Sequence, residues 1–413
     1  MTTVKKKDGS LEQFCSEKVS SGVSKAMASI SYEDEILPTI VAKAVCSTFS
    51  GATDPVPVGE VHKEVENTLM RCTAYDVARE YITYRDRNKP DIFRPRVAYR
   101  PFEYPQFRQV CEAIEKSYWV VGEFDYTGDV QDFHIRMSEE EKQVVTRTML
   151  AISQIEAASV KTFWAKVYDR MPKPEINDVG VCFADSERRH SDAYAELIHI
   201  LGLDHMFEGV MGVDAIKNRV AYLKKFANPK DDSNKEYMQS ILLFSMFIEN
   251  VSLFSQFLII MSFDKYRNQL TGMGTAVQAT SAEENIHALF GGELINIIRE
   301  ENPDWFDDEL VGKVHEAALT SFNAEMGIID WIFEEGDLDF ISKYEVVEFI
   351  KDRFNRSMED INFPHVFADV DQQVLEKFDW FNVQINSTTM SDFFARRSTE
   401  YNVNQDYSTE SIW

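Results

Sequence analysis

Residues 187–194 read Glu-Arg-Arg-His-Ser-Asp-Ala-Tyr, and residues 284–287 read Glu-Asn-Ile-His. Each stretch contains a glutamate that is followed three positions later by a histidine. On a helix, residues three apart lie on the same face, so both side chains of such a pair can bind one metal ion. The sequence therefore predicts two helices that each contribute a pair of metal ligands, namely Glu187 with His190 and Glu284 with His287.

Helical phase separates these pairs from a third one, Glu196 with His199. Glu196 follows Glu187 by nine residues, which is about half a revolution around a helix, so we expect the third pair to be exposed. Tyr194 follows His190 by four residues and therefore lies on the metal-facing side. A phenol beside an oxidised metal cluster can carry a radical; the alternative for Tyr194 is a packed core tyrosine.

Two further glutamates lie in otherwise apolar stretches. Glu156 lies among apolar residues between positions 152 and 163, and Glu249 among apolar residues between positions 242 and 257. An unpaired buried carboxylate is very costly, so each is expected to contact a metal, a proton or a cationic partner. Four glutamates and two histidines on four helices match a dinuclear carboxylate site, for which iron or manganese is better suited than zinc. The alternative is that these groups pair among themselves.

The chain divides by pattern into a small N-terminal unit and a long helical region. Residues 1–90 predict an α+β unit, with a strand, a turn and a strand over 4–11 and helices over 16–30, 32–49, 58–71 and 75–88. Residues 91–105, rich in proline and arginine, predict a linker, and the polar residues 386–413 predict a mobile tail. Residues 106–385 predict an all-α bundle, with helices over 106–116, 138–167, 179–200, 213–226, 235–267, 269–301, 307–334 and 342–358.

Composition excludes several classes of protein. A formal net charge of −26 disfavours binding to nucleic acid, because phosphate backbones would be repelled. The five cysteines are odd in number and form no Cys-x-x-Cys pair, which favours a reduced, cytoplasmic protein. The apolar stretch 241–263 is long enough to span a membrane, but it contains Glu249, Asn250 and Gln256. We therefore predict a central helix of a soluble bundle, with no membrane partner.

Residues from about 107 to 401 resemble the small, radical-generating subunit of class I ribonucleotide reductases. The resemblance rests on an acid, then Glu-x-x-His-x-x-x-Tyr, then an acid, then Glu-x-x-His. The separations are also similar to those of the family, with 31 residues from Glu156 to Glu187 and 35 from Glu249 to Glu284. The resemblance implies a mainly α, ferritin-like bundle that holds two iron or manganese ions per chain and forms a homodimer.

The resemblance also implies a function as a ribonucleoside-diphosphate reductase subunit. An oxidising equivalent would be stored on Tyr194 or on the metals and passed through Trp119 and Tyr401 to a separate large subunit, where ribonucleotides are reduced to deoxyribonucleotides. Trp119 lies in Tyr-Trp-Val-Val-Gly-Glu-Phe-Asp, which looks like the family's relay tryptophan. Tyr401 ends a segment similar to the family's tail, and Tyr407 is its rival.

Three departures from the family pattern leave the metal and the radical site open. Glu156 stands where an aspartate is more usual, and Leu253 stands where many members have phenylalanine. Glu283 stands where the family usually has an aspartate that links Trp119 to the metal.

Residues 1–90 resemble an ATP-cone, a nucleotide-sensing domain that usually occurs on the large subunit. The similarity covers the N-terminal hairpin, residues 61–66 and residues 77–85. It implies that ATP and dATP act as allosteric effectors, that dATP inhibits, and that a larger assembly forms with dATP. The candidate nucleotide-binding residues are Val4, Lys6, Lys7, Glu12, Lys18 and His62. The lysines would supply phosphate partners, or else form a solvated basic edge.

Three other functions fit parts of the pattern. A stand-alone di-metal carboxylate oxidase would need an apolar substrate channel and no tail tyrosine. A ferritin-like iron store would form a closed shell. A nucleotide-sensing regulator with a structural bundle would bind nucleotide without redox activity.

Overall fold

The structure is a computed structural model that describes residues 2–5, 11–87, 90–157, 160–227 and 231–386. Within helices, the side chains of residues 85–87, 156–157, 160–162 and 225–227 lie outside the described part. Contacts divide the chain into two compact units, one within residues 1–90 and another that begins at Asp91. Each unit has its own apolar core, so each is described by itself.

The N-terminal unit is a small sheet packed with helices. Strand β1 (Thr3–Lys5) pairs antiparallel with β2 (Leu11–Gln13) and parallel with β3 (Val56–Pro57). The sequence predicted the first two strands but missed β3, because a strand of only two residues has no alternation to detect. Its helices are α1 (Ser16–Ser29), α2 (Leu37–Thr48), α3 (Val58–Arg71) and α4 (Tyr75–Arg87).

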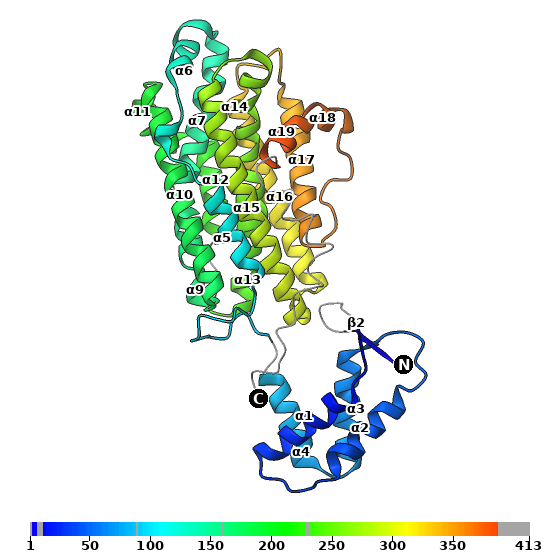
Figure 1. The fold of residues 1–413 in the computed structure, drawn as a ribbon. Coiled ribbons are helices and arrows are strands. Elements are labelled where there is room, and N and C mark those ends of the chain that lie inside the picture. Colours follow the sequence, from blue (N-terminus) through cyan, green and yellow to red (C-terminus); the bar gives the residue numbers. More distant parts are fainter. Residues whose placement is uncertain (1, 6–10, 88–89, 158–159, 228–230, 387–413) are drawn as a thin grey trace. The chain divides into compact units, whose positions relative to one another are not determined.

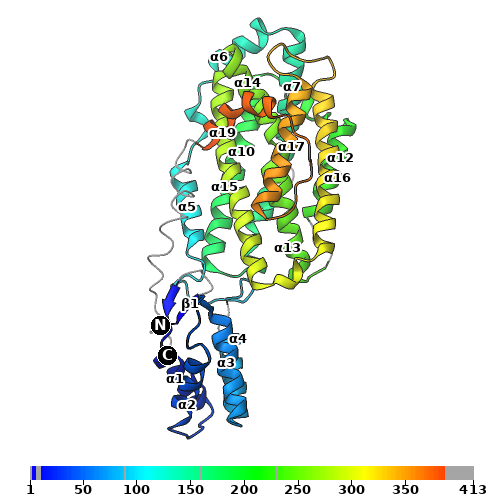
Figure 2. The same cartoon turned by 90° about the vertical axis from the view of Figure 1, so that its right-hand side faces the viewer.

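The second unit is a helix bundle, and its described residues contain no strand. The bundle is shown from two sides in Figures 1 and 2. Its main helices are α5 (Gln106–Lys116), α7 (Glu139–Ala157), α10 (Pro174–Ile200), α12 (Asp214–Ala227), α13 (Asn234–Leu243), α14 (Phe254–Arg267), α15 (Thr271–Glu301), α16 (Asp308–Ile332) and α17 (Lys343–Asp360). Shorter helices are α6 (Thr127–Gln131), α8 (Val160–Ala165), α9 (Val167–Arg170), α11 (Asp204–Phe207), α18 (Gln372–Lys377) and α19 (Asp379–Asn386). The prediction of a mainly α, ferritin-like bundle after a small α+β unit is confirmed.

Two predicted long helices are interrupted. In the segment predicted as one helix over 138–167, the described residues form α7 and α8, and a turn at Lys166 separates α8 from α9, so the prediction of one continuous helix to Val167 was wrong. The helix predicted over 235–267 contains a π-helical segment, η4 (Phe244–Ser252), between α13 and α14. All nine residues of η4 are buried, so no exposed polar face marks its periodicity and the sequence carries no signal of the wider turn.

Glycine allows α15 to approach η4 closely. A Cβ atom at Gly291 would lie 2.2 Å from both Cβ and Oγ of Ser245, a separation that real Cβ atoms essentially never show. Gly291 follows His287 on α15 by four residues, and Ser245 precedes Glu249 on η4 by four. The absence of a side chain at position 291 therefore lets the two helices bring His287 and Glu249 together.

The long apolar stretch is part of the core. By length and composition the helical stretch Asn234–Arg267 could cross a membrane, but 94% of its most apolar window is buried inside the bundle. Two of its polar side chains are engaged within the protein, since Glu249 contacts His287 and Asn250 contacts Arg353. These observations agree with the prediction of a central bundle helix.

Candidate metal centre

Three helical elements bring four predicted ligands into one cluster. Glu187 comes from α10, Glu249 from η4, and Glu284 with His287 from α15. All four are buried, and one donor atom from each lies within 4.8 Å of the others. The imidazole Nδ1 of His287 lies 3.0 Å from a Glu187 oxygen and 3.3 Å from oxygens of both Glu249 and Glu284. We call this set the His287 half of the centre.

The second histidine faces the same carboxylates from the other side. The Nδ1 atom of His190 lies 2.9 Å from Oε1 of Glu284 and 3.7 Å from Oε2 of Glu187. The two imidazole centroids are 6.1 Å apart. Glu284 and Glu187 therefore lie between the two histidines, as bridging ligands of two ions would. We call His190 with these two carboxylates the His190 half.

The remaining predicted ligand is Glu156. Its backbone belongs to α7, but its side chain lies outside the described residues. Its role as a ligand stays a prediction.

The geometry of the donors fits metal ions. Two donors that bind one ion at about 2.1 Å and at right angles are about 3 Å apart, which is the spacing around His287. Both oxygens of Glu187 and both of Glu284 are buried, and none of them accepts a hydrogen bond from a described residue. Buried carboxylate oxygens without hydrogen bonds are costly unless a cation replaces them. The residues present therefore fit a cluster of divalent ions.

Electrostatics at the centre point the same way. Burial raises the pKa of Glu249 well above its ordinary value, and the charges of Glu284 and Glu187 raise it further. Burial also acts to raise the pKa of Glu284, but the neighbouring imidazoles of His190 and His287 outweigh it and lower the pKa. For both histidines burial acts to lower the pKa, yet their carboxylate neighbours raise it well above its ordinary value. The cluster stabilises positive charge at its middle.

Behind His190, a buried network leads to Trp119. The Nε2 atom of His190 lies 2.8 Å from Oε2 of Glu283, so its proton can be held there while Nδ1 faces the carboxylates. Arg189 pairs with Glu283 at 3.0 Å and also donates to the backbone carbonyl of Trp119 at 3.4 Å. The indole of Trp119 stacks on the His190 ring, with centroids 5.9 Å apart and planes 8° from parallel.

The expected link through Glu283 is therefore only partly present. Glu283 contacts His190, but within the described part of the chain the indole N–H of Trp119 donates no hydrogen bond. Ring stacking on His190 and the Arg189 guanidinium connect Trp119 to the centre instead.

Two residues of the site were not found from the sequence. Trp164 of α8 donates its indole N–H to Oε1 of Glu249 at 3.0 Å, which leaves Oε2 facing His287. Its only sequence signal is a buried aromatic near the first acid. Arg189 lies inside the Glu-Arg-Arg-His stretch, but helical phase turns it away from the ligand face, so spacing alone does not reveal its partner Glu283.

Tyr194 and Leu253 are both buried in the core beside these elements, with 1% and 2% of their surface exposed. The third acidic pair is exposed as predicted, and His199 faces Asp204 at 3.2 Å. The tail residues Tyr401 and Tyr407 lie outside the described residues.

The candidate nucleotide residues are spread over the N-terminal unit. Val4 on β1 pairs with Glu12 on β2. The Glu12 carboxylate forms an ion pair of 2.5 Å with the exposed Lys18. His62 on α3 contacts the hydroxyl of Tyr81 on α4 at 2.9 Å. Lys6 and Lys7 lie outside the described residues.

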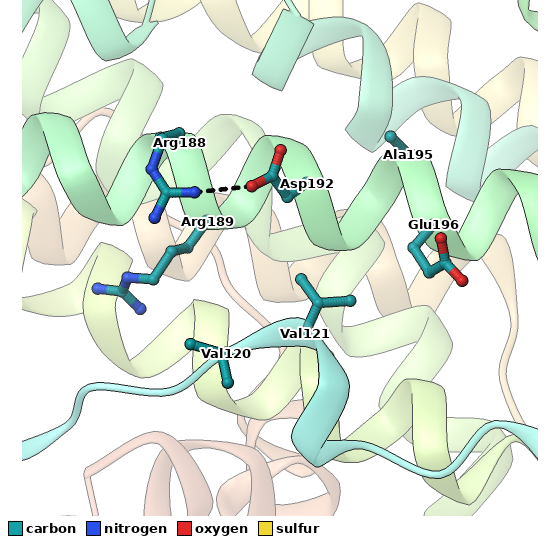
Figure 3. A pocket seen from close by; sticks show the side chains of 7 residues that line it. All are labelled: Val120, Val121, Arg188, Arg189, Asp192, Ala195 and Glu196. Carbon is teal, nitrogen blue, oxygen red and sulfur yellow. Dashed lines mark hydrogen bonds and ion pairs between the residues drawn. The ribbon is translucent and has the colours of Figure 1, made fainter.

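An open depression lies on the outer side of α10, where Arg189 of the buried network behind His190 forms part of its wall. It measures about 500 Å³ and is lined by Val120, Val121, Arg188, Arg189, Asp192, Ala195 and Glu196 (Figure 3). Arg188 and Asp192 form an ion pair of 2.8 Å across part of it. Because several lining residues are charged, this depression is not the apolar channel that a stand-alone oxidase would need.

Glutamates and histidines that project inward from the long helices of a bundle define the class of ferritin-like carboxylate proteins. Within that class, a family model for the ribonucleotide reductase small chain matches residues 96–373, and one for the ATP cone domain matches residues 2–90. The chain belongs to the ribonucleotide reductase small-chain family and carries an ATP cone at its N-terminus.

Individual relatives agree with this assignment. A probable ribonucleoside-diphosphate reductase small subunit of Invertebrate iridescent virus 3 is 25% identical over 75% of this chain and 85% of its own length. The ribonucleoside-diphosphate reductase subunit beta of Chlamydia pneumoniae is 22% identical over 64% of this chain and 78% of its own.

Solved structures share the fold. A putative class I ribonucleotide reductase from Bacillus halodurans superposes with a TM-score of 0.62 at 13% identity, covering 67% of this chain and 99% of that one. An R2-like ligand-binding oxidase with a Mn/Fe cofactor superposes with a TM-score of 0.55 at 19% identity, covering 63% of this chain and 97% of that one. Since both proteins have this fold, the fold alone does not select between reductase and oxidase.

Proposed function

We propose that this chain is the radical-generating subunit of a ribonucleoside-diphosphate reductase and is active only with a separate large subunit. It would store one oxidising equivalent and pass it to the large subunit, which reduces ribonucleotides to deoxyribonucleotides. The observation that carries the proposal is the buried Glu187–Glu284–His190–His287 cluster with Trp119 stacked behind His190. Homodimer formation and a cytoplasmic location are parts of the same proposal.

The proposed ligands divide between two ions, iron or manganese. The His287 half would hold one with Glu187, Glu249, Glu284 and His287, and the His190 half would hold the other with Glu156 added. When bound, these ions supply the oxidising power, and this chain's side chains store and conduct it. Tyr194 becomes a neutral phenoxyl if it gives up one electron and its phenolic proton.

Transfer outward begins at Trp119. Trp119 gives up one electron and regains one from Tyr401, with Tyr407 as the alternative donor; the tyrosine releases its phenolic proton and is reduced in turn by the large subunit. His190 and Glu283 hold one proton between them at Nε2 and Oε2, 2.8 Å apart, which keeps the imidazole oriented toward the carboxylates.

Electron paramagnetic resonance of the metal-loaded, oxygen-treated protein tests the storage site. We expect a narrow organic-radical line that disappears in Tyr194→Phe while the metal content stays at two ions per chain. A multiline manganese spectrum without that line would place the equivalent on the metals and leave Tyr194 as a core residue. Redox-silent protein after metal loading would contradict the proposed function.

The ATP cone supports a second part of the proposal, namely that ATP and dATP control the assembly. Lys18 is 66% exposed on its side chain and lies beside the hairpin, where it can meet a phosphate. We expect dATP to increase the size of the full-length protein in light scattering and to inhibit turnover. Lys18→Ala should weaken this response, whereas Lys43→Ala, an exposed lysine of α2, should keep it. Equal sizes with ATP, with dATP and without nucleotide would contradict this regulation.

A further inference from the structure

A buried arginine holds the backbone beside a proposed metal ligand. Arg353 on α17 donates from Nε and Nη2 to the backbone carbonyl of Asn250, at 2.9 Å and 2.8 Å. Nη2 also donates to the Asn250 side-chain oxygen. Asn250 directly follows Glu249 in the π-helical segment η4. One guanidinium therefore captures both oxygens of the residue next to the ligand.

The cation has no carboxylate partner of its own. Within the described part of the chain, Arg353 forms no ion pair, although its side chain is buried. Burial lowers its pKa to about 9, so it remains protonated at neutral pH. Burying a cation is costly, and here the Asn250 oxygens, the ring of Phe254, whose centroid lies 3.7 Å away, and the charges of Asp360 and Asp352 offset part of the cost. Phe254 is the first residue of α14, so Arg353 contacts one residue before and one residue after Ser252, where η4 ends.

The η4 backbone is tied to other groups at two carbonyls. The wider turns of a π-helix are rare and are frequently found at functional sites. A second carbonyl of η4, that of Phe247, accepts the hydroxyl of Ser252 at 2.9 Å. At Asn250 the donor comes from a different helix, so the position of the backbone there depends on α17.

We propose that Arg353 is a positioning residue for the metal centre, which fixes η4 at Asn250 and thereby sets where the Glu249 carboxylate lies. The inference rests on the proposed function, because it treats Glu249 as a metal ligand. Glu249 belongs to the His287 half and not to the contacts of His190. Loss of Arg353 should therefore weaken one of the two ions selectively.

The test is a titration of metal-free, full-length protein with Mn²⁺, in which the signal of free Mn²⁺ is followed by electron paramagnetic resonance. Wild type should bind two ions per chain. Arg353→Leu should keep one tight ion and bind the other roughly 10- to 100-fold more weakly, the usual effect of removing a partner that orients a ligand. Arg353→Lys should show a partial loss, because an ammonium cannot bridge both Asn250 oxygens as the guanidinium fork does.

A destabilised control separates positioning from stability. Phe349 lies on the same helix, four residues before Arg353, and its ring packs on Phe378 and Phe381. Phe349→Ala should lower the melting temperature but retain both wild-type Mn²⁺ affinities. Equal affinities in Arg353→Leu and wild type would overturn the inference, as would unfolding of both Arg353 variants while Phe349→Ala folds. If wild type itself fails to bind two ions, the proposed function fails instead.

Discussion

Replacing Glu284 by glutamine is expected to remove both metal ions and to reduce turnover to background. Like Glu187, Glu284 contacts both imidazoles, at 2.9 Å from His190 Nδ1 and 3.3 Å from His287 Nδ1. Glutamine has nearly the same shape but no charge and only one acceptor oxygen. It therefore cannot bridge two cations. The loss of metal affinity should exceed roughly 100-fold, which is the usual upper limit for residues that only orient a metal ligand.

Thermal unfolding gives a readout of this prediction that does not depend on activity. An ion at 100 times its dissociation constant stabilises the folded state by about 2.7 kcal/mol, so Mn²⁺ should raise the melting temperature of wild type. It should leave Glu284→Gln unshifted. Glu300→Gln, an exposed position on the same helix, is the matched control and should respond as wild type does. A variant at position 284 that still binds two ions tightly would refute the bridging assignment.

Much of the centre could be read from the sequence because helical spacing decides it. The two Glu-x-x-His pairs lie on α10 and α15 and face each other, since residues three apart necessarily share a face. Glu249 was found for a different reason, as an acid in an apolar stretch, and it is buried against His287. These predictions used only local periodicity and the cost of a buried charge.

What the sequence could not supply depends on tertiary contacts. Arg353 lies 103 residues from Asn250, and Trp164 lies 85 residues from Glu249, so no spacing rule connects either pair. The wide turns of η4 leave no trace in a stretch that is buried on every side. Glu283 and Glu284 are adjacent acids with different contacts, and only the fold shows that Glu283 turns toward Arg189.

Replacing Trp119 by phenylalanine is expected to abolish turnover with the large subunit while metal content stays at two ions per chain. Phenylalanine keeps an aromatic ring against His190, where the indole now stacks at 5.9 Å. A phenyl ring is much harder to oxidise than an indole, so the outward transfer should stop at this position. The folded state should lose only about 1–3 kcal/mol, because the side chain becomes smaller but stays apolar.

Two comparisons make the result specific to electron transfer. Tyr118→Phe removes only the hydroxyl of the exposed residue that precedes Trp119. The ring stays against Arg189, so turnover should be unaffected. Tyr401→Phe should reproduce the Trp119→Phe loss, and Tyr407→Phe should not, if Tyr401 is the tail donor. Substantial turnover in Trp119→Phe with full metal content would mean that the equivalent leaves the centre by another route. Loss of metal in that variant would instead make Trp119 a structural support of His190.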